Sequence, residues 1–252
     1  MRPLILNYHA FGKRSTADDP HHHFVPVDAF ADQIDALLGR GWNPLDESSY
    51  LAGLRAQRWP AHSFLITIDD GFVSTLEGGE VLAARGVPAI VYIPAGLLGG
   101  STGAWPSEMK DEPLLDADGV RALVGCGVSV GAHGWDHAPM RDMAPEELRR
   151  NTYEARRVLA DVVGVAPRTF AYPGGHYDAA ARAAVEAAGY DAAFAVAGND
   201  GPYAIPRVDV NASDTPRTFA LKCSRWWPAA QVVGSRLPRL RRALHRLAGS
   251  AR

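Results

Sequence analysis

The sequence predicts an α/β fold in which parallel strands alternate with helices. Short apolar runs rich in Val, Ile and Phe alternate with longer segments whose apolar residues recur at helical spacing. Several of the apolar runs end directly at polar residues, which is typical of buried parallel strands whose carboxyl ends carry a functional site. These two observations favour either a barrel or a doubly wound sheet with helices packed outside the strands.

The first predicted unit is a strand, a helix and a second strand. Residues 4–8 and 64–68 are apolar runs of strand length, and residues 27–38 place apolar side chains every three or four positions before Gly39. The same order recurs along the chain, with helices expected at 80–85, 115–123, 145–163 and 179–188, and strands at 89–93, 128–131, 168–172 and 192–196.

Composition predicts one main domain followed by a tail. The 252 residues are 47% hydrophobic and contain neither a repeat nor a Pro/Gly/Ser-rich linker. Residues 215–252 hold nine Lys or Arg and no acidic residue, which leaves 17 basic and 28 acidic groups, a net charge of −11, in residues 1–214. We therefore expect a catalytic barrel over residues 1–214 and a basic tail over residues 215–252.

The N-terminal stretch and the two cysteines indicate the cellular location expected for the protein. The apolar stretch at the N-terminus is too short for the apolar region of a signal peptide, so a cytoplasmic protein is expected. Cys126 and Cys223 form neither a CxxC nor a Cys/His pattern, which predicts two reduced thiols and no cysteine zinc site.

Polar residues follow four of the predicted strands: His9, the pair Asp69 and Asp70, the pair His133 and His137, and the turn at residues 173–175. Two histidines four apart would lie on one side of a helical turn and could reach one metal ion, with a carboxylate as the third ligand. Adjacent carboxylates point in different directions, so one could bind the metal while the other acts as a base. Taken alone, each pattern also occurs as an ordinary turn or a hydrogen-bonded histidine.

Three motifs resemble those of the polysaccharide deacetylases of carbohydrate esterase family 4. Residues 67–71 (TIDDG) resemble the family's T-F-D-D-G motif, and residues 133–137 (HGWDH) resemble its H-[ST]-x-x-H motif. Residues 170–175 (FAYPGG) are similar to the F-A-Y-P-Y-G form of its third motif. The resemblance runs from about residue 4 to residue 210 and implies an irregular (β/α) barrel with about seven strands.

The resemblance also implies roles for individual residues. Asp69 is expected to be the general base, and a divalent metal ion, zinc in most of the family, is expected to be held by Asp70, His133 and His137. The backbone N–H of Gly174 is expected to contribute to the site that binds the oxyanion.

Two departures from the family pattern point to a subgroup. Ala171 stands where the third motif usually has an arginine, and the usual late Leu-x-His is not found. The opening Tyr-His at residues 8–9 and the Pro-Arg-Val at residues 206–208 resemble the subgroup that deacetylates poly-N-acetylglucosamine. His9 is then expected to be the general acid, and Arg207 an electrostatic partner of the base. A histidine hydrogen-bonded in place and a structural salt bridge are the alternatives.

Aromatic and histidine side chains near these motifs are further candidates. Trp105 and Tyr172, together with Trp135, could present a ring face to a sugar or could pack as core or rim residues. His176 could contact substrate. The run at residues 21–23 (HHH) is expected to be a solvated loop.

The tail combines basic and apolar residues at helical spacing beyond the Trp pair at residues 226–227. It could attach the protein peripherally to an anionic inner membrane surface, or it could pack on the barrel. Nucleic acid is not an expected partner, because the acidic barrel would repel phosphates.

The sequence thus predicts a metal-dependent hydrolase that removes an N-acyl group, an acetyl group above all, from an amino sugar in a polysaccharide, oligosaccharide or lipid-linked glycan. Removal of a formyl group from a lipid-linked amino sugar would use the same site. A catalytically silent glycan-binding protein is the alternative from a different class, suggested by the two departures.

Overall fold

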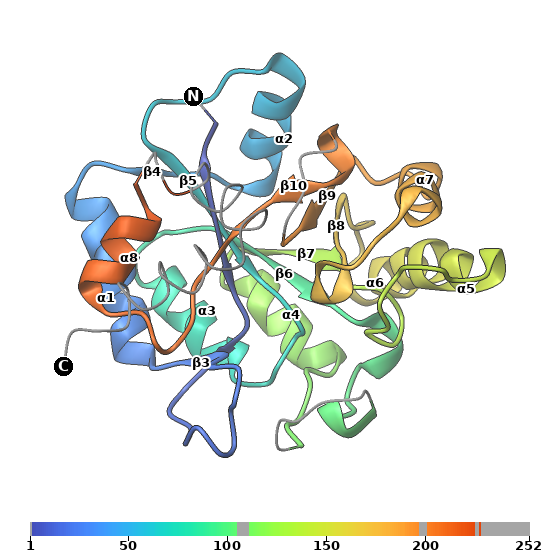
Figure 1. The fold of residues 1–252 in the computed structure, drawn as a ribbon, viewed down its shortest axis with the longest axis horizontal. Coiled ribbons are helices and arrows are strands. Elements are labelled where there is room, and N and C mark those ends of the chain that lie inside the picture. Colours follow the sequence, from blue (N-terminus) through green and yellow to red (C-terminus); the bar gives the residue numbers. More distant parts are fainter. Residues whose placement is uncertain (1, 105–110, 197–200, 225–226, 228–252) are drawn as a thin grey trace, which may run out of the picture.

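The fold is a nearly closed barrel of parallel strands surrounded by helices (Figure 1). The structure, a computed structural model, describes residues 2–104, 111–196, 201–224 and 227. Along the barrel the strand order is β10-β9-β8-β7-β6-β5-β1-β11, and neighbouring strands in this order pair in parallel. The prediction of an irregular parallel barrel is confirmed, with eight strands in the described order where about seven were expected.

The barrel strands are short, as buried parallel strands usually are. Their bounds are β1 Leu4–Tyr8, β5 Ser63–Ile68, β6 Ala89–Ile93, β7 Val128–Ala132, β8 Thr169–Ala171, β9 Ala192–Ala195, β10 Ile205–Pro206 and β11 Val208–Asp209. Strand β4 (Asn43–Pro44) pairs with β5 beside this order, and β2 (Ala10–Phe11) pairs with β3 (Phe24–Val25) as a separate ribbon.

The chain itself joins the two ends of the barrel sheet. Strands β10 and β11 lie at opposite ends of the strand order, yet only Arg207 separates them in sequence. Arg207 therefore lies at the seam of the barrel, and it is 2% exposed. Strands of two residues carry no readable periodicity, which is why neither was predicted.

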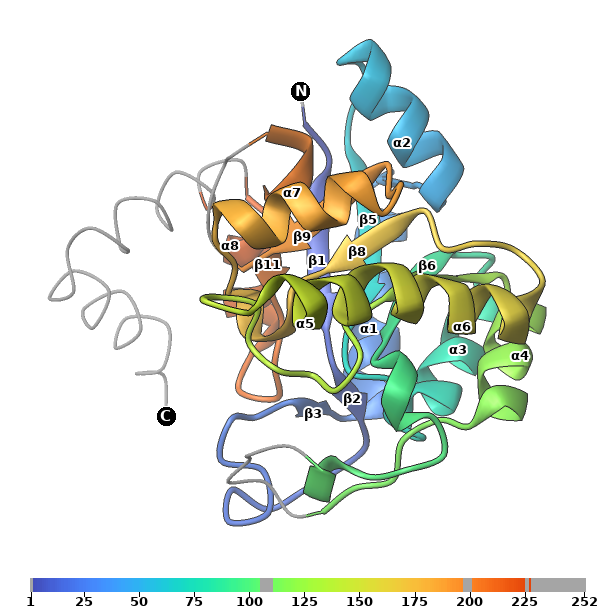
Figure 2. The ribbon, with the colours of Figure 1, turned by 90° about the vertical axis from the view of Figure 1, so that its right-hand side faces the viewer.

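Helices lie around the strands in both views (Figures 1 and 2). They are α1 Val27–Gly39, α2 Glu47–Ala56, α3 Thr75–Ala83, α4 Ala117–Gly125, α5 Pro145–Arg149, α6 Ala155–Val163, α7 Ala179–Ala187 and α8 Pro216–Lys222. A π-helical segment at Arg150–Glu154 joins α5 to α6, so the long helix predicted at residues 145–163 is present with one irregular stretch. Helix α3 begins earlier than the predicted 80–85, and α2, whose sequence begins with polar residues, was not predicted.

Alternating strand residues build two apolar layers. Leu6 and Ile66 belong to the main cluster, which also contains Phe30 and Ile34 of α1. Their strand neighbours Ile5 and Leu65 belong instead to a second cluster with aromatic residues of β6 and β9 and with residues of α2. The first layer packs strands against the outer helices, and the second joins the barrel strands to α2.

The first part of the predicted tail packs on the barrel. Helix α8 buries Phe219 and Cys223 in the main cluster, and Trp227 packs against the same cluster. Lys222 also forms an ion pair with Asp214, with 2.6 Å between Nζ and Oδ2. Residues 216–222 thus belong structurally with the barrel, whereas residues 228–252 lie outside the described residues and their division from residues 1–214 stays a prediction. Within the described part of the chain, no helix is long and apolar enough to cross a membrane.

Candidate active site

The polar residues singled out from the sequence gather at one end of the barrel. His9 follows β1, Asp69 and Asp70 follow β5, His133 follows β7, and the turn Pro173–Gly175 follows β8. Since these strands are parallel, their carboxyl ends open on the same side. The topology therefore brings together side chains that are far apart in the sequence.

Asp70 faces both histidines of the 133–137 motif. Its Oδ1 lies 3.2 Å from His133 Nε2 and 3.0 Å from His137 Nε2. The expectation that the histidines share a helical turn is wrong, because residues 133–137 form a loop that contains positive φ angles at Gly134 and His137. The loop nevertheless directs both rings to the same carboxylate.

Asn151 holds this loop in place. Its Oδ1 accepts a hydrogen bond of 2.8 Å from the backbone N–H of Trp135, and its Nδ2 donates to the carbonyl of Glu147. A Cβ at position 134 would lie 2.8 Å from the same Asn151 oxygen, so only glycine fits there. Sequence reasoning missed Asn151, whose one signal is a polar residue within a long helix.

Asp70, His133 and His137 fit a divalent metal ion. Their ligand atoms lie within 4.8 Å of one another, the one such group among the described residues. The Ala171 carbonyl, an acceptor only, lies 2.7 Å from His133 Nδ1, which therefore carries the proton when the ring is neutral. In that state the Nε2 lone pair faces the Asp70 carboxylate, an arrangement that a metal ion between the two atoms would stabilise; without a metal, a protonated His133 donates from Nε2 to Asp70 instead.

Ionisation of Asp70 supports the same conclusion. Burial raises the pKa of this carboxyl, but the charge of His137 and hydrogen bonds from both histidines outweigh burial and hold the pKa well below its ordinary value. The group is therefore a carboxylate at neutral pH, the form that binds metals.

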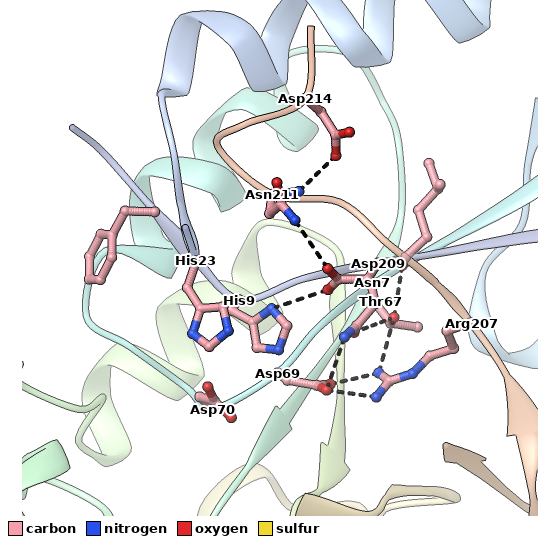
Figure 3. Close-up of polar contacts among 12 residues, drawn as sticks. Asn7, His9, His23, Thr67, Asp69, Asp70, Arg207, Asp209, Asn211 and Asp214 are labelled. Carbon is pink, nitrogen blue, oxygen red and sulfur yellow. Dashed lines mark hydrogen bonds and ion pairs between the residues drawn. The ribbon is translucent and has the colours of Figure 1, made fainter. Parts of the chain in front are cut away.

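Asp69 points away from Asp70 and forms an ion pair with Arg207 (Figure 3). Arg207 donates from Nη1 to Oδ1 at 2.7 Å and from Nη2 to Oδ2 at 2.6 Å, a forked ion pair between side chains that are both buried. Asn7 adds a weaker bond at 3.3 Å. Although burial raises the pKa of Asp69, the charges of Arg207 and His133 bring it below its ordinary value.

The guanidinium of Arg207 lies close to two aromatic rings. Its guanidinium carbon lies 5.7 Å from the centre of the Tyr92 ring and 5.9 Å from that of Phe194. Ala171, which stands at the usual arginine position of the third motif, is buried in the second apolar cluster. Position 171 thus carries no charge, and the positive charge next to Asp69 comes from Arg207 at the barrel seam.

His9 lies between Asp209 and the two adjacent carboxylates (Figure 3). Its Nδ1 is 3.9 Å from Asp209 Oδ1, and its charge also acts on Asp69 and Asp70. Asp209, on β11, was not singled out from the sequence because nothing in its local pattern marks it.

His23 covers one face of His9. The two rings stack with 4.3 Å between centroids and 12° between planes. The expectation that residues 21–23 form a solvated loop is therefore wrong for His23. The pKa of His23 is lowered to about 4, mainly by burial and to a smaller extent by the charge of His9. Its ring is therefore neutral at neutral pH.

The remaining candidates differ in their placement. Tyr172 is fully buried in the main cluster and donates its hydroxyl to the Tyr203 carbonyl at 3.0 Å, so the expectation that its ring faces a sugar is wrong. Trp105 lies outside the described residues. Gly174 adopts a φ of 59° in the turn after β8, and His176 is exposed beside it.

Comparison with known proteins agrees with this geometry. The family model described as polysaccharide deacetylase matches residues 56–193, more than half of the chain. No curated protein sequence matches.

Solved structures share the fold at low identity. The Streptococcus pyogenes deacetylase PplD, in complex with acetate, is 17% identical with a TM-score of 0.77, and the match covers 89% of this chain and 99% of that chain. IcaB from Ammonifex degensii is 21% identical with a TM-score of 0.72, covering 89% of this chain and 96% of that chain. A de-N-acetylase from Aggregatibacter actinomycetemcomitans is 15% identical with a TM-score of 0.71, covering 87% of this chain and 98% of that chain.

The matched residues 56–193 contain Asp69, Asp70, His133 and His137. The resemblance inferred from the three motifs is thereby confirmed, as is assignment to the hydrolases. The chain belongs to the polysaccharide deacetylase family and is a hydrolase of the carbohydrate N-deacetylase class.

Proposed function

We propose that this protein removes the N-acetyl group of an amino sugar in a glycan, with Asp69 as general base and His9 as general acid. The observation that supports this most is the division of labour between adjacent carboxylates. Asp70 faces His133 and His137, whereas both carboxylate oxygens of Asp69 accept hydrogen bonds from Arg207, which orients it. An amide hydrolase needs both a ligand and a base at such a place.

A divalent cation, zinc by the family resemblance, would be held by Asp70, His133 and His137 and would polarise the amide carbonyl. Asp69 accepts the proton of the attacking water, and Arg207 keeps that carboxylate oriented and ionised. The Gly174 N–H donates to the oxyanion that develops on the substrate. His9 protonates the leaving amine, which is a poor leaving group without that proton.

Arg207 helps to decide between an active enzyme and a catalytically silent glycan-binding protein. That alternative rested partly on Ala171, which lacks the usual arginine of the third motif. Arg207 makes a forked contact to Asp69, and His9 lies 3.9 Å from Asp209. We take these two residues as substitutes for the missing arginine and the missing Leu-x-His, which favours an active enzyme over a binding protein.

Release of acetate and of formate would test the proposal. Zinc-loaded protein would be incubated with a panel of N-acetylated and N-formylated amino sugars, as oligosaccharides and as lipid-linked sugars. Acetate release by the wild type and its loss in Asp69→Asn, with zinc content unchanged, is the expected result. Formate without acetate would select deformylation, and release of neither while the glycan is bound would leave the binding protein as the better description.

Peripheral attachment to an anionic membrane through the tail remains a prediction. Because α8 is part of the core, the fair comparison is between the full chain and a chain that ends at Trp227, not one cut at Asp214. Flotation with anionic liposomes that is equal for both chains would contradict a role for residues 228–252.

A further inference from the structure

A cavity on the same side of the barrel as the candidate active site shares the turn after β8 with it. Its volume is about 620 Å³, and its lining comes from the segments that follow β7, β8 and β9. Gly174 and Gly175, the turn proposed to hold the oxyanion, form part of its wall. A sugar next to the one being deacetylated would therefore enter this cavity.

The cavity carries cationic side chains. Arg141 and Arg182 line it as cations, His176 lines it as well, and Asp178 is the one carboxylate among its described lining residues. This contrasts with residues 1–214 as a whole, where acidic groups outnumber basic ones 28 to 17. A positively charged recess in an acidic barrel attracts anions that the surrounding surface repels.

Asp178 is occupied by structural hydrogen bonds. As the N-cap of α7 it accepts from the backbone N–H of Ala181 at 2.8 Å, and its second oxygen accepts from the N–H of Asp142 at 2.9 Å. Backbone donors of this kind stabilise the carboxylate and lower the pKa of Asp178. Its two oxygens are thus occupied by backbone donors, and the charge of Arg141 adds a smaller lowering of its pKa without forming an ion pair with it.

Arg141 is exposed and has no ion-pair partner within the described ranges. Many exposed arginines of this molecule do have one: Arg55 pairs with Asp191, Arg85 with Asp35 and Arg149 with Glu146. An unpaired guanidinium at the wall of a recess is well placed to bind a phosphate or carboxylate in a forked geometry.

The remaining walls suit a sugar ring. Tyr177 and Val196 line the cavity, and Tyr177 stacks on the buried ring of Tyr172 at 4.8 Å, which makes it a rigid surface. The recess therefore combines an apolar wall for a pyranose with cations for an acidic substituent.

We propose that this cavity binds an anionic substituent, a phosphate ester or a uronate carboxylate, on the sugar that neighbours the residue to be deacetylated. The proposal rests on the deacetylase function for its meaning in catalysis, but the cavity's affinity for the anion does not depend on turnover. The preferred substrate is thus an acidic or phosphate-bearing glycan rather than a neutral homopolymer.

Two measurements on zinc-loaded protein test this. Calorimetry compares binding of N-acetylglucosamine 6-phosphate with N-acetylglucosamine, and of hyaluronan tetrasaccharide with chitotetraose, so that phosphate and carboxylate are separated. At low salt the wild type should bind at least one acidic member about tenfold more tightly than its neutral partner. Arg141→Gln should remove that preference and leave affinity for the neutral sugars unchanged.

Arg58→Gln is the matched control, since Arg58 is exposed in the segment that precedes β5, at the opposite end of the strands, and the charge change is the same. Equal affinity for acidic and neutral members in the wild type, or an equal loss in Arg58→Gln and Arg141→Gln, would overturn the proposal. Acetate release is measured alongside. Preferential binding of acidic sugars without acetate release would support the anion-binding cavity and contradict the deacetylase function. Acetate release without preference for acidic sugars would support the deacetylase function and contradict the anion-binding cavity.

Discussion

The two halves of the site are built in different ways. The ligand half, Asp70 with His133 and His137, comes from two local motifs directly after β5 and β7. The proposed acid and base half joins Asp69, after β5, to Arg207, just before β11, and joins His9, after β1, to Asp209 of β11. Those partners are 138 and about 200 residues apart in the chain.

This difference shows how the family chemistry can tolerate change. The ligand half depends on loop geometry that a short motif encodes. For the acid and base half we propose that the position of a charge in space matters more than its position in the sequence, so that Arg207 at the barrel seam takes the role of the arginine missing at position 171. Loss of a residue should therefore have a different signature in each half.

Asp70→Ala should produce the largest effect. It removes the carboxylate that faces both histidines, so zinc affinity should fall by at least about 100-fold and activity should be lost with it. Equilibrium dialysis and acetate release measure the two. His62→Ala, an exposed histidine at the other end of β5, is the control. Retention of zinc by Asp70→Ala would show that the two halves are divided wrongly.

Arg207→Ala should mainly destabilise the protein while leaving zinc bound. It strands Asp69 as a buried, unpaired carboxylate, which costs about 3–5 kcal/mol. Urea unfolding measures the loss. In an Asp69→Asn background the same change should cost much less, because no buried charge remains. An equal cost in both backgrounds would mean that packing between Tyr92 and Phe194, rather than charge, explains the role of Arg207.

His9→Gln should lower kcat by about 100-fold, with little change in KM or zinc content, since it removes the proton donor but no ligand. Asp209→Asn should have a smaller effect, about tenfold on kcat, because Asp209 is partly exposed and 3.9 Å from the ring. Steady-state kinetics on one N-acetylated substrate measure both. A larger loss in Asp209→Asn than in His9→Gln would contradict their assigned order.

The smallest effect concerns the pH dependence of stability. The pKa of His23 is about 4 in the folded protein against an ordinary value near 6.5. As the pH falls below 6.5, the unfolded chain takes up a proton before the folded one does, so this residue should cost about 2 kcal/mol of stability between pH 7 and pH 5. His23→Phe keeps a ring against His9 without titrating. Urea titrations with a chelator present should therefore show a shallower pH dependence for His23→Phe, and identical slopes would refute the assignment.

The ligand half and most of the barrel could be predicted from the sequence. Strands such as β1 and β6 begin and end where their apolar runs do, because a parallel strand buried on both faces is apolar over most of its length. Parallel order then obliges polar residues at successive strand ends to meet on one side. For that reason the motifs around Asp70 and His133 can be joined into one site from the sequence alone.

Tertiary structure alone decided the rest. The forked ion pair between Arg207 and Asp69 depends on closure of the barrel at β10 and β11. These strands have two residues each and leave no periodic signal in the sequence. The stacking of His23 on His9, the support of the 133–137 loop by Asn151 and the burial of Tyr172 depend equally on long-range packing. Local pattern records what a residue needs from its own element, whereas electrostatic partners across the barrel are set only when the chain closes on itself.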